Sequence, residues 1–475
     1  MFINGVWCEA DSKKTFEVTN PATGAGIAEI PDGGGSDTVR AIQAAHDAFA
    51  GWSQMTAYQR SGILYKAHGL MSKERENIAR TMTAEQGKPL RAAMNEVQYG
   101  SDFLLWYAEE AKRVYGETIP APRGDQRFVV LHQPVGVVAA VTPWNYPASM
   151  ITRKVAPALA AGCTIVLKPA EATPLCAIEI FKILEEAGVP PGVANLITGL
   201  DPKPIGQEFI SNPLVRKITF TGSTETGKLL ARGAANQMKR VSLELGGHAP
   251  FLVLKDADPV FAAKGAVLVK FLNTGQACIC PNRIFVHKSG VAAFTNEFVS
   301  RVEKMRAGNG LDDGVNIGPL VNEEAVNKVE RQVEDALEKG AELLCGGHRL
   351  LGDELEGGHY YAPTVLGNVT SQMLIYREET FGPVAPIIAF DDDDDILTMA
   401  NDTHYGLAAY IYTQNLSAAM RTFEGLRFGI VGINDINPTA AAAPFGGQKE
   451  SGLGREGGHE GIMEYLETKL GGFSI

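Results

Sequence analysis

The 475-residue chain is poor in cysteine, has no long hydrophobic run and carries no excess of positive charge. Its six cysteines are too few for a disulfide scaffold, and none stands in the paired CxxC spacing of a zinc site. No segment approaches the roughly 20 apolar residues that a membrane span needs. The first residues, Met1–Gly5, show no charged leader followed by an apolar block. We therefore expect a cytoplasmic protein that does not insert into membranes.

The charge balance argues against nucleic acid as a partner. Lysine and arginine number 43 against 55 acidic residues, a formal net charge of −12, without the basic cluster that binds phosphate backbones. The chain is 45% hydrophobic and 21% charged, as in ordinary globular proteins, and its length allows about three domains. Because no linker of biased composition separates them, we expect these domains to be interleaved or closely docked.

Between residues 135 and 245, short apolar segments alternate with helical patterns. Thr173 and Pro174 are placed to begin one of the helices, with the Thr173 side chain as its N-cap. Strands separated by helices indicate right-handed crossovers and a parallel sheet, in which ligands bind beyond the carboxyl ends of the strands. The predicted strands are 137–141, 164–167, 194–197 and 217–220, and the segments that follow them are 142–145, 168–171, Gly199 and 221–223.

Two glycine-rich segments match nucleotide-binding motifs only in part. Segment 222–229 follows a predicted strand and nearly spells a P-loop, but Leu229 stands where the motif needs a hydroxyl for magnesium. A P-loop-like nucleotide hydrolase is therefore a remote alternative, although the free N–H groups of such a turn still suit a phosphate. Segment 452–457 has the letters of GxGxxG, yet it follows no clear strand and too few residues remain after it. We interpret it as a flexible loop.

Two residues have chemical potential on their own. Cys278 follows an apolar helical pattern that ends at 273–275, so its thiol lies on a loop, as an inert residue or as a nucleophile of lowered pKa. Glu244 interrupts an apolar strand-like run, where a carboxylate is either part of an ion pair or a general base of shifted pKa. The residues alone leave both alternatives open.

At these residues the sequence resembles the aldehyde dehydrogenase superfamily, over essentially the whole chain. The resemblance includes features of succinate-semialdehyde dehydrogenases and of lactaldehyde and glycolaldehyde dehydrogenases. Chance is an implausible explanation for seven motifs in the family's order. They are Pro143–Pro147, Lys168–Glu171, Phe220–Ser223, Leu243–Gly247, Asn273–Cys278, Glu378–Pro383, and Pro444–Gly447 with Ser451–Gly454.

The resemblance implies oxidation of an aldehyde to the acid without a metal. Cys278 would attack the aldehyde carbon, and the side-chain amide of Asn145 together with the backbone N–H of Cys278 would hold the oxyanion. Glu244 would activate the water that hydrolyses the resulting thioester. Lys168 is expected beside these catalytic residues.

The resemblance also implies a nicotinamide cofactor. Lys168 and Glu171 would face the adenosine ribose, where the Glu171 carboxylate would accept hydrogen bonds from a ribose 2′-OH and repel a 2′-phosphate. We therefore expect NAD in preference to NADP. The other residues expected to bind the cofactor are Trp144, Gly222, Ser223, Leu245, Glu379 and Phe381.

The substrate is less clear. Arg153 stands in a segment similar to succinate-semialdehyde dehydrogenases, in which this arginine anchors the distal carboxylate; the alternative is an ordinary exposed helix cation. Those enzymes usually have a second arginine where this chain has Leu272, and their serine-bearing loop is replaced by 437–443. A hydroxyaldehyde or sugar-derived aldehyde is thus the alternative substrate. Cys280 is a candidate for a reversible disulfide with Cys278, although the two-residue spacing strains the disulfide geometry.

The expected fold is α/β, with interleaved units. A Rossmann-like NAD-binding domain with a parallel sheet would comprise 1–118 and 138–246, and an α/β catalytic domain 247–448. A small protruding oligomerisation sheet would comprise 119–137 and 459–475. We expect a homodimer or homotetramer that acts on a small-molecule aldehyde.

Overall fold

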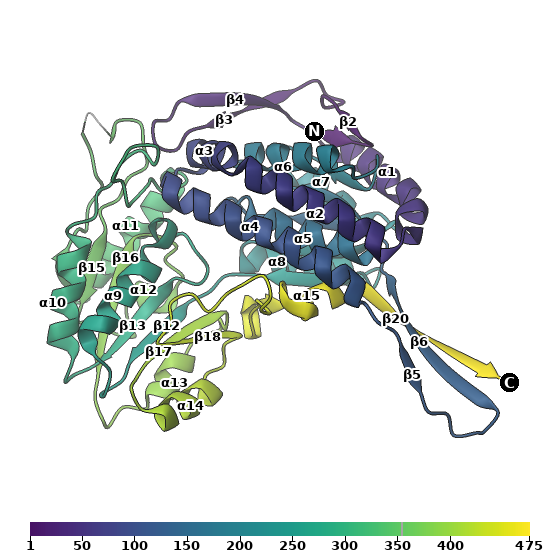
Figure 1. Cartoon of the computed structure of the whole chain (residues 1–475). Helices are drawn as coiled ribbons and strands as arrows, with labels where there is room; N and C mark the ends of the chain where they lie inside the picture. Colours follow the sequence, from purple (N-terminus) through teal and green to yellow (C-terminus); the bar gives the residue numbers. More distant parts are fainter. Residues whose placement is uncertain (353–354) are drawn as a thin grey trace.

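The computed structural model describes residues 1–352 and 355–475 and arranges them around two large β-sheets (Figure 1). The five central strands of the first sheet pair in parallel. This confirms the predicted parallel α/β sheet. In spatial order the first sheet is β19 (Gly452–Leu453), β11 (Arg240–Glu244), β10 (Val215–Thr221), β7 (Val137–Val141), β8 (Thr164–Lys168), β9 (Ala194–Leu196), β1 (Phe2–Ile3) and β2 (Val6–Trp7).

Helices cover both faces of the first sheet. Successive residues of a strand point to opposite faces, so each strand contributes side chains to two separate cores. Val137 and Ala139 pack with α1 (Gly35–Gln54), α7 (Pro202–Ser211) and α8 (Thr224–Ala235). Val138 and Ala140 pack in a separate core on the other face. None of the helices in the described ranges is long and apolar enough to cross a membrane. The helices of that other face are α2 (Ala57–Lys73), α3 (Arg75–Gln86), α4 (Leu90–Glu110), α5 (Ser149–Ala161) and α6 (Pro174–Ala187), with η1 (Ala111–Arg113) after α4.

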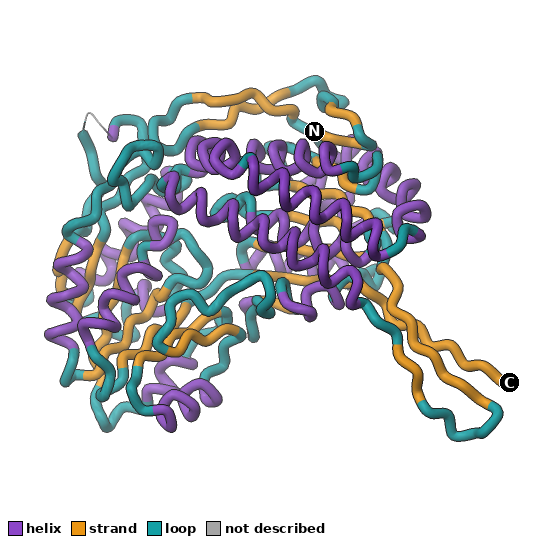
Figure 2. The backbone as a smooth tube through the Cα atoms, in the orientation of Figure 1, coloured by secondary structure: helices purple, strands orange, loops and turns teal. Residues whose placement is uncertain are grey.

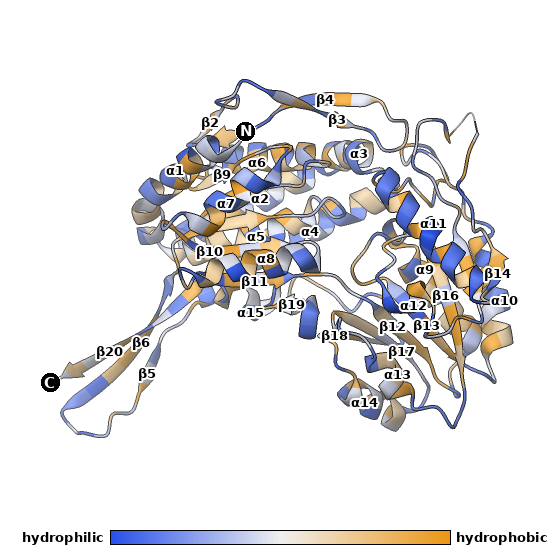
Figure 3. Ribbon diagram, turned by 180° about the vertical axis from the view of Figure 1, so that it is seen from behind, coloured by the Kyte–Doolittle hydropathy of each residue, from blue (hydrophilic) through white to orange (hydrophobic). Residues whose placement is uncertain are grey.

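The second sheet also has helices on both faces. Its inner strands are coloured toward the hydrophobic end of the scale in Figure 3, whereas α11 is mostly hydrophilic on its outer side. One face packs on α9 (Pro259–Lys270) and α10 (Val291–Val302), the other on α11 (Glu323–Glu338), α12 (Leu374–Arg377) and α13 (Ile396–Asn401), and α14 (Leu416–Gly425) follows β17. In spatial order the strands are β14 (Glu342–Cys345), β15 (Thr364–Gly367), β16 (Val384–Phe390), β13 (Pro281–His287), β12 (Ala249–Val253), β17 (Ala408–Tyr412) and β18 (Ile430–Ile433).

A small three-stranded sheet extends away from the body as an arm (Figure 2). β20 (Leu466–Ser474) pairs along its whole length with β6 (Gln126–Pro134), and β5 (Glu117–Ile119) completes the arm. These strands overlap the ranges predicted for the protruding sheet, although Val137 lies in β7 and His459 in α15 (Gly458–Met463). A separate hairpin consists of β3 (Thr15–Thr19) and β4 (Gly26–Pro31).

Two local predictions were wrong. The Thr173 side chain does not cap α6; instead the buried carboxylate of Glu85 accepts hydrogen bonds from the N–H groups of Leu175 at 2.7 Å and Cys176 at 2.8 Å. The two oxygens of the Glu85 carboxyl group accept from two of the free N–H groups of the first helical turn at once, which a single hydroxyl oxygen at Thr173 does less well. Segment 452–457 is also not a free loop, because β19 pairs with β11 after the 3-10 turn η4 (Lys449–Ser451). Both partners are remote in sequence, so no local pattern indicates them.

Candidate active site

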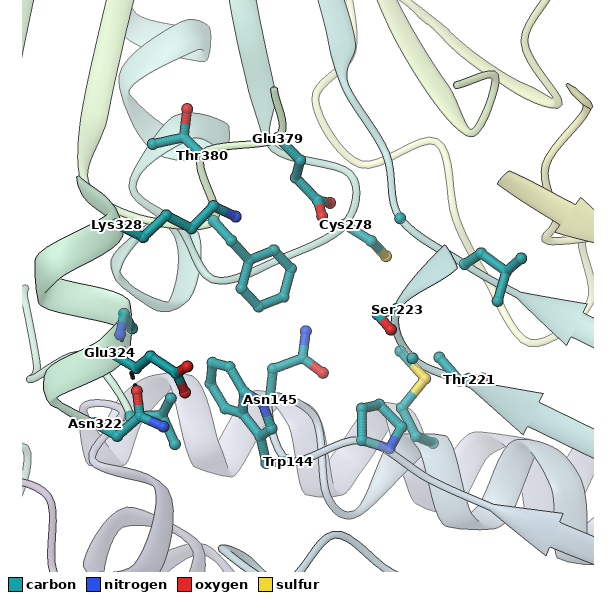
Figure 4. Close-up of a pocket in the computed structure, with 18 of the residues that line it drawn as sticks. Trp144, Asn145, Thr221, Ser223, Cys278, Asn322, Glu324, Lys328, Glu379 and Thr380 are labelled. Carbon is teal, nitrogen blue, oxygen red and sulfur yellow. Dashed lines mark hydrogen bonds between the residues drawn. The ribbon is translucent and has the colours of Figure 1, made fainter. Parts of the chain in front are cut away.

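Most of the predicted catalytic and cofactor-binding residues line a cavity of about 720 Å³ between the two large sheets, here called the first cavity; Glu244, Lys168 and Glu171 are not among its lining residues. Its walls include the loop after β7, the turn after β10, the segment after β11 and the loop that carries Cys278 (Figure 4). The parallel strands thus place their carboxyl ends on one side of this cavity, as the sheet topology requires. The predicted residues that line it are Trp144, Asn145, Gly222, Ser223, Leu245, Cys278, Glu379 and Phe381.

Cys278 is held by a strained turn. After α9 the chain forms η2 (Leu272–Gly275), in which Asn273, Thr274 and Gly275 all have positive φ, at 50°, 60° and 77°. This conformation is rare for a β-branched residue such as threonine and is tolerated only where the surroundings enforce it. The Thr274 hydroxyl accepts a hydrogen bond from the Gly318 N–H at 3.0 Å. The packed neighbourhood therefore fixes the direction in which the chain enters the Cys278 segment.

The Cys278 thiol is half-buried and lines both the first cavity and a second one. Burial, together with the nearby carboxylates of Glu379 and Glu244, raises the pKa of the thiol to about 12, although the Arg153 guanidinium acts in the opposite direction. The thiol is therefore neutral at rest. A nearby base or a change in these charges is needed to form the reactive thiolate.

Asn145 is buried beside the nucleophile segment, and its amide points into the first cavity (Figure 4). Its Nδ2 donates to the backbone carbonyl of Gln276 at 3.0 Å. Its own backbone carbonyl accepts hydrogen bonds from Asn273 Nδ2 at 3.0 Å and from Lys88 Nζ at 2.7 Å. A side-chain amide has two N–H donors, so the second remains available to an oxygen in the cavity.

Glu244 ends β11 and is buried, with Oε2 lacking a hydrogen-bond partner among the described residues. Burial raises the pKa of Glu244 well above its usual range, and the Glu456 carboxylate adds to this, while Arg153 and Lys154 oppose it. Glu456 in turn pairs with both cations, at 2.9 Å from Arg153 Nε and in direct contact with Lys154. A carboxyl group that retains its proton unusually well is poised for proton transfer.

A second cavity, of about 360 Å³, opens on the other side of Cys278. Arg153 lines it and is only 2% exposed, so of the two alternatives for this residue the exposed helix cation is wrong. Its guanidinium lies 3.9 Å from the ring centre of Phe445, and its Nη2 has no hydrogen-bond partner in the described ranges. The burial follows from the ion pair with Glu456, which stands 303 positions later in the sequence.

A buried ion pair between Lys88 and Glu96 also lines the second cavity and was not found from the sequence. Glu96 Oε1 accepts hydrogen bonds from the N–H groups of Ala148 at 2.9 Å and Ser149 at 3.2 Å, at the start of α5. Lys88 Nζ also lies 4.0 Å from the ring centre of Tyr146. The only sequence signal is two opposite charges eight positions apart, a spacing that does not by itself predict contact.

Leu272 and Cys280 lie on the same side of the molecule as the second cavity but differ in exposure. Leu272 is 37% exposed and lines the cavity. Cys280 is fully buried, and its thiol donates to the Val269 carbonyl at 3.2 Å. In the described part of the chain Cys278 and Cys280 are both free thiols. Their disulfide stays a hypothesis.

The segments after β8 and β10 fit a dinucleotide. Lys168 Nζ donates to the Pro169 carbonyl at 2.9 Å and to Glu171 Oε2 at 3.2 Å. Glu171 is half-exposed and follows the strand end, where a ribose can reach its carboxylate. Ser223 is the N-cap of α8, so the positive end of that helix faces the first cavity. Carboxylate and helix terminus are thus the two features that a ribose and a pyrophosphate need.

The opposite wall of the first cavity comes from α11 and the segment before β16. Trp144 and Phe381 form an edge-to-face pair with ring centres 5.6 Å apart, and Phe381 has a positive φ of 54°. Glu379 Oε1 accepts a hydrogen bond from the Gly247 N–H at 2.9 Å. Lys328 of α11 also lines this wall and points across it (Figure 4). The sequence did not predict this position, because the pattern of α11 does not distinguish Lys328 from an ordinary exposed lysine.

Comparison with known proteins gives consistent results over the whole chain. A model of the aldehyde dehydrogenase family matches residues 7–470. The chain is 50% identical to 3-sulfolactaldehyde dehydrogenase of Pseudomonas putida, over 99% of this chain and 96% of that protein. It is 49% identical to the succinate-semialdehyde dehydrogenase [NADP(+)] GabD of Escherichia coli (strain K12), over 98% and 96%.

Two solved structures extend this comparison to the fold. A succinate-semialdehyde dehydrogenase from Burkholderia pseudomallei has a TM-score of 0.97 at 47% identity, covering 100% of this chain and 97% of that one. A betaine aldehyde dehydrogenase from Staphylococcus aureus in complex with NAD+ also has a TM-score of 0.97, at 37% identity, covering 100% and 94%.

Proposed function

The chain belongs to the aldehyde dehydrogenase family, and from this premise we propose that it oxidises a short aldehyde to the acid. The proposed aldehyde carries a distal negative charge, as succinate semialdehyde does, and NAD is the preferred cofactor. One observation carries the proposal: the buried Arg153 guanidinium lines the same cavity as Cys278 and keeps Nη2 without a partner among the described residues. A buried cation with an unused donor favours an anionic ligand.

The residues around Cys278 support the following sequence of steps. The thiolate of Cys278 attacks the aldehyde carbon, and the new oxyanion accepts hydrogen bonds from the free N–H of the Asn145 amide and the backbone N–H of Cys278. When bound, a nicotinamide cofactor would accept the hydride that leaves the former aldehyde carbon as the oxyanion becomes the carbonyl of a thioester with Cys278. Glu244 then takes a proton from water, whose oxygen attacks the thioester; the acid leaves and the Cys278 thiol is restored.

The preference for NAD rests on Glu171. Its carboxylate follows β8, at the predicted ribose side, and is half-exposed. A ribose 2′-OH can donate to this group, whereas a 2′-phosphate would be repelled. Lys168 offsets part of this charge, since its Nζ lies 3.2 Å from the same carboxylate. The relative from Escherichia coli is named as NADP-dependent, so the cofactor needs a direct measurement.

A hydroxyaldehyde with an anionic end is the second candidate. The hydroxyl groups of Tyr99 and Tyr146, both on residues that line the second cavity, have no hydrogen-bond partner among the described residues. Asn437 and Thr439 line the same space. These polar groups suit a substrate hydroxyl better than the methylene chain of succinate semialdehyde. The similarity to a 3-sulfolactaldehyde dehydrogenase agrees with this candidate.

The test is a panel of aldehydes compared by kcat/KM: succinate semialdehyde, 3-sulfolactaldehyde, lactaldehyde and butanal. We expect the two anionic aldehydes to exceed butanal by about 10- to 100-fold, the value of a charged hydrogen bond. Whichever of the two is higher identifies the substrate class. A butanal value equal to both would refute the role of Arg153.

A further inference from the structure

A hollow of about 610 Å³ adjoins the second cavity, and we call it the vestibule. The two spaces share wall residues from α4, α9 and η2. These are Ala92, Asn95, Leu268, Leu272 and Asn273. Because both hollows share these residues, the vestibule is a direct neighbour of the cavity that reaches Cys278.

The vestibule carries an excess of positive charge from three separate segments. Arg91 stands in the first turn of α4, Lys264 on α9, and Arg301 and Lys304 at and beyond the end of α10. Glu297 is the one carboxylate that lines it within the described ranges, and it pairs with Arg301 at 2.7 Å. Arg91, Lys264 and Lys304 are exposed and form no ion pair with any residue that the structure describes.

This local excess contrasts with the rest of the molecule. The chain has a formal net charge of −12, so the molecule as a whole carries an excess of negative charge. The first cavity balances Lys328 and Arg331 with Glu324 and Glu379. A concave cationic site on an anionic protein concentrates the field and raises the local concentration of negative ligands.

We propose that the vestibule is an anion-capture site that binds the carboxylate or sulfonate end of the aldehyde before it passes to Arg153. The apolar Leu272 stands at the junction and offers no charge of its own. The outer cations therefore hold the anion first, and Arg153 receives it beside Cys278. This inference rests on the proposed function only in that the aldehyde is anionic.

The experiment compares two double variants with equal changes in net charge. Lys264→Glu/Lys304→Glu reverses two vestibule cations, whereas Lys73→Glu/Arg421→Glu reverses two exposed cations that do not line it. For each variant, kcat/KM for succinate semialdehyde, 3-sulfolactaldehyde and butanal is measured between 20 and 300 mM salt, on the order of the range over which surface charges become screened. Inhibition of butanal oxidation by glutarate, an unreactive dicarboxylate, gives a second measurement.

We expect the vestibule variant to lose about tenfold in kcat/KM for the anionic aldehydes at low salt, with kcat and the butanal values unchanged. The loss should shrink as salt increases, and glutarate should inhibit this variant more weakly than the control. Equal losses of kcat/KM in both double variants, or an equal loss for butanal, would overturn the proposal that the vestibule captures the anion. If the wild type prefers butanal, the proposed function fails, and glutarate inhibition still decides the vestibule.

Discussion

The two cavities that meet at Cys278 are built in different ways. In the first, strand ends and the turns after them form one side and supply the backbone N–H groups at the start of α8, while α11 and segment 379–381 form the other side. The second is formed by side chains from α4, α5, α9 and the loop around Asn437. Backbone geometry is shared by a whole fold, whereas side chains vary freely. The first cavity thus holds the common chemistry and the second the choice of substrate.

The largest expected effect concerns the residue common to both cavities. Cys278→Ala should lower kcat by at least about 10⁴-fold for every aldehyde, because no other thiol lines either cavity within the described residues. The matched control is Cys280→Ala, two positions away and fully buried, which should retain activity. NADH formation measures both, and activity in the Cys278 variant would show that another nucleophile operates.

A substitution of Glu244 tests whether hydrolysis of the thioester is independent of the residues that line the second cavity. Glu244→Gln should lower the steady-state rate by about 10²- to 10⁴-fold while a burst of NADH equal to the enzyme concentration remains. Because the pKa of Glu244 is raised by burial and by Glu456, the group is protonated and inactive at low pH, and the wild-type rate should rise with pH through that pKa.

The glutamine variant should lose this rising limb of the pH profile. Rapid mixing at several pH values separates the burst from the steady state. If the rising limb persists in Glu244→Gln, a group other than Glu244 accepts the proton from water.

Arg153 and Asn145 sharpen the contrast between the cavities. Arg153→Gln should raise KM for succinate semialdehyde by about 10- to 100-fold and leave KM for butanal unchanged, since only the charged substrate loses a contact. Any fall in kcat should be shared by both aldehydes, because the guanidinium also lowers the pKa of Cys278 and of Glu244. Asn145→Ala should lower kcat about 10²- to 10³-fold for both aldehydes, because it removes an oxyanion donor. The same pattern in both variants would mean that the cavities do not divide chemistry from selection.

The smallest effect is expected at Glu171, where the adenosine ribose of the cofactor is proposed to bind. Glu171→Ser should raise the ratio of kcat/KM with NADP to that with NAD by about tenfold, because a repulsive carboxylate is removed. Glu179→Ser, on the outer side of α6, is a matched control. A wild type that already prefers NADP would contradict the role given to Glu171.

The sequence predicted the parts of the molecule whose causes are local. Alternating apolar segments placed β7, β8, β9 and β10, and the ordered motifs placed Cys278, Asn145 and Glu379 at one cavity. Where a partner is remote, prediction failed. Glu85 replaced Thr173 as the cap of α6, because a carboxylate from another helix competes better for free N–H groups.

The same reason explains what was missed on the substrate side. Arg153 could be read as an exposed cation because its counter-ion lies on a distant segment, and the Lys88–Glu96 pair has no periodic signature. A lone charged residue in a sequence indicates the surface unless its partner is known. The charged residues of the second cavity, Lys88, Glu96 and Arg153, are all of this kind.

The position of Glu456 sets the order in which the protein can be assembled during synthesis. Arg153 and Lys154 are buried side by side, and the carboxylate that pairs with both stands 302 residues after Lys154. Until the ribosome has delivered that late segment, α5 cannot settle onto its sheet without enclosing two uncompensated cations, which is costly. A chain that stops short of Glu456 should therefore leave this helix unsettled, so that incomplete products are open to proteases and do not accumulate as partly active enzyme.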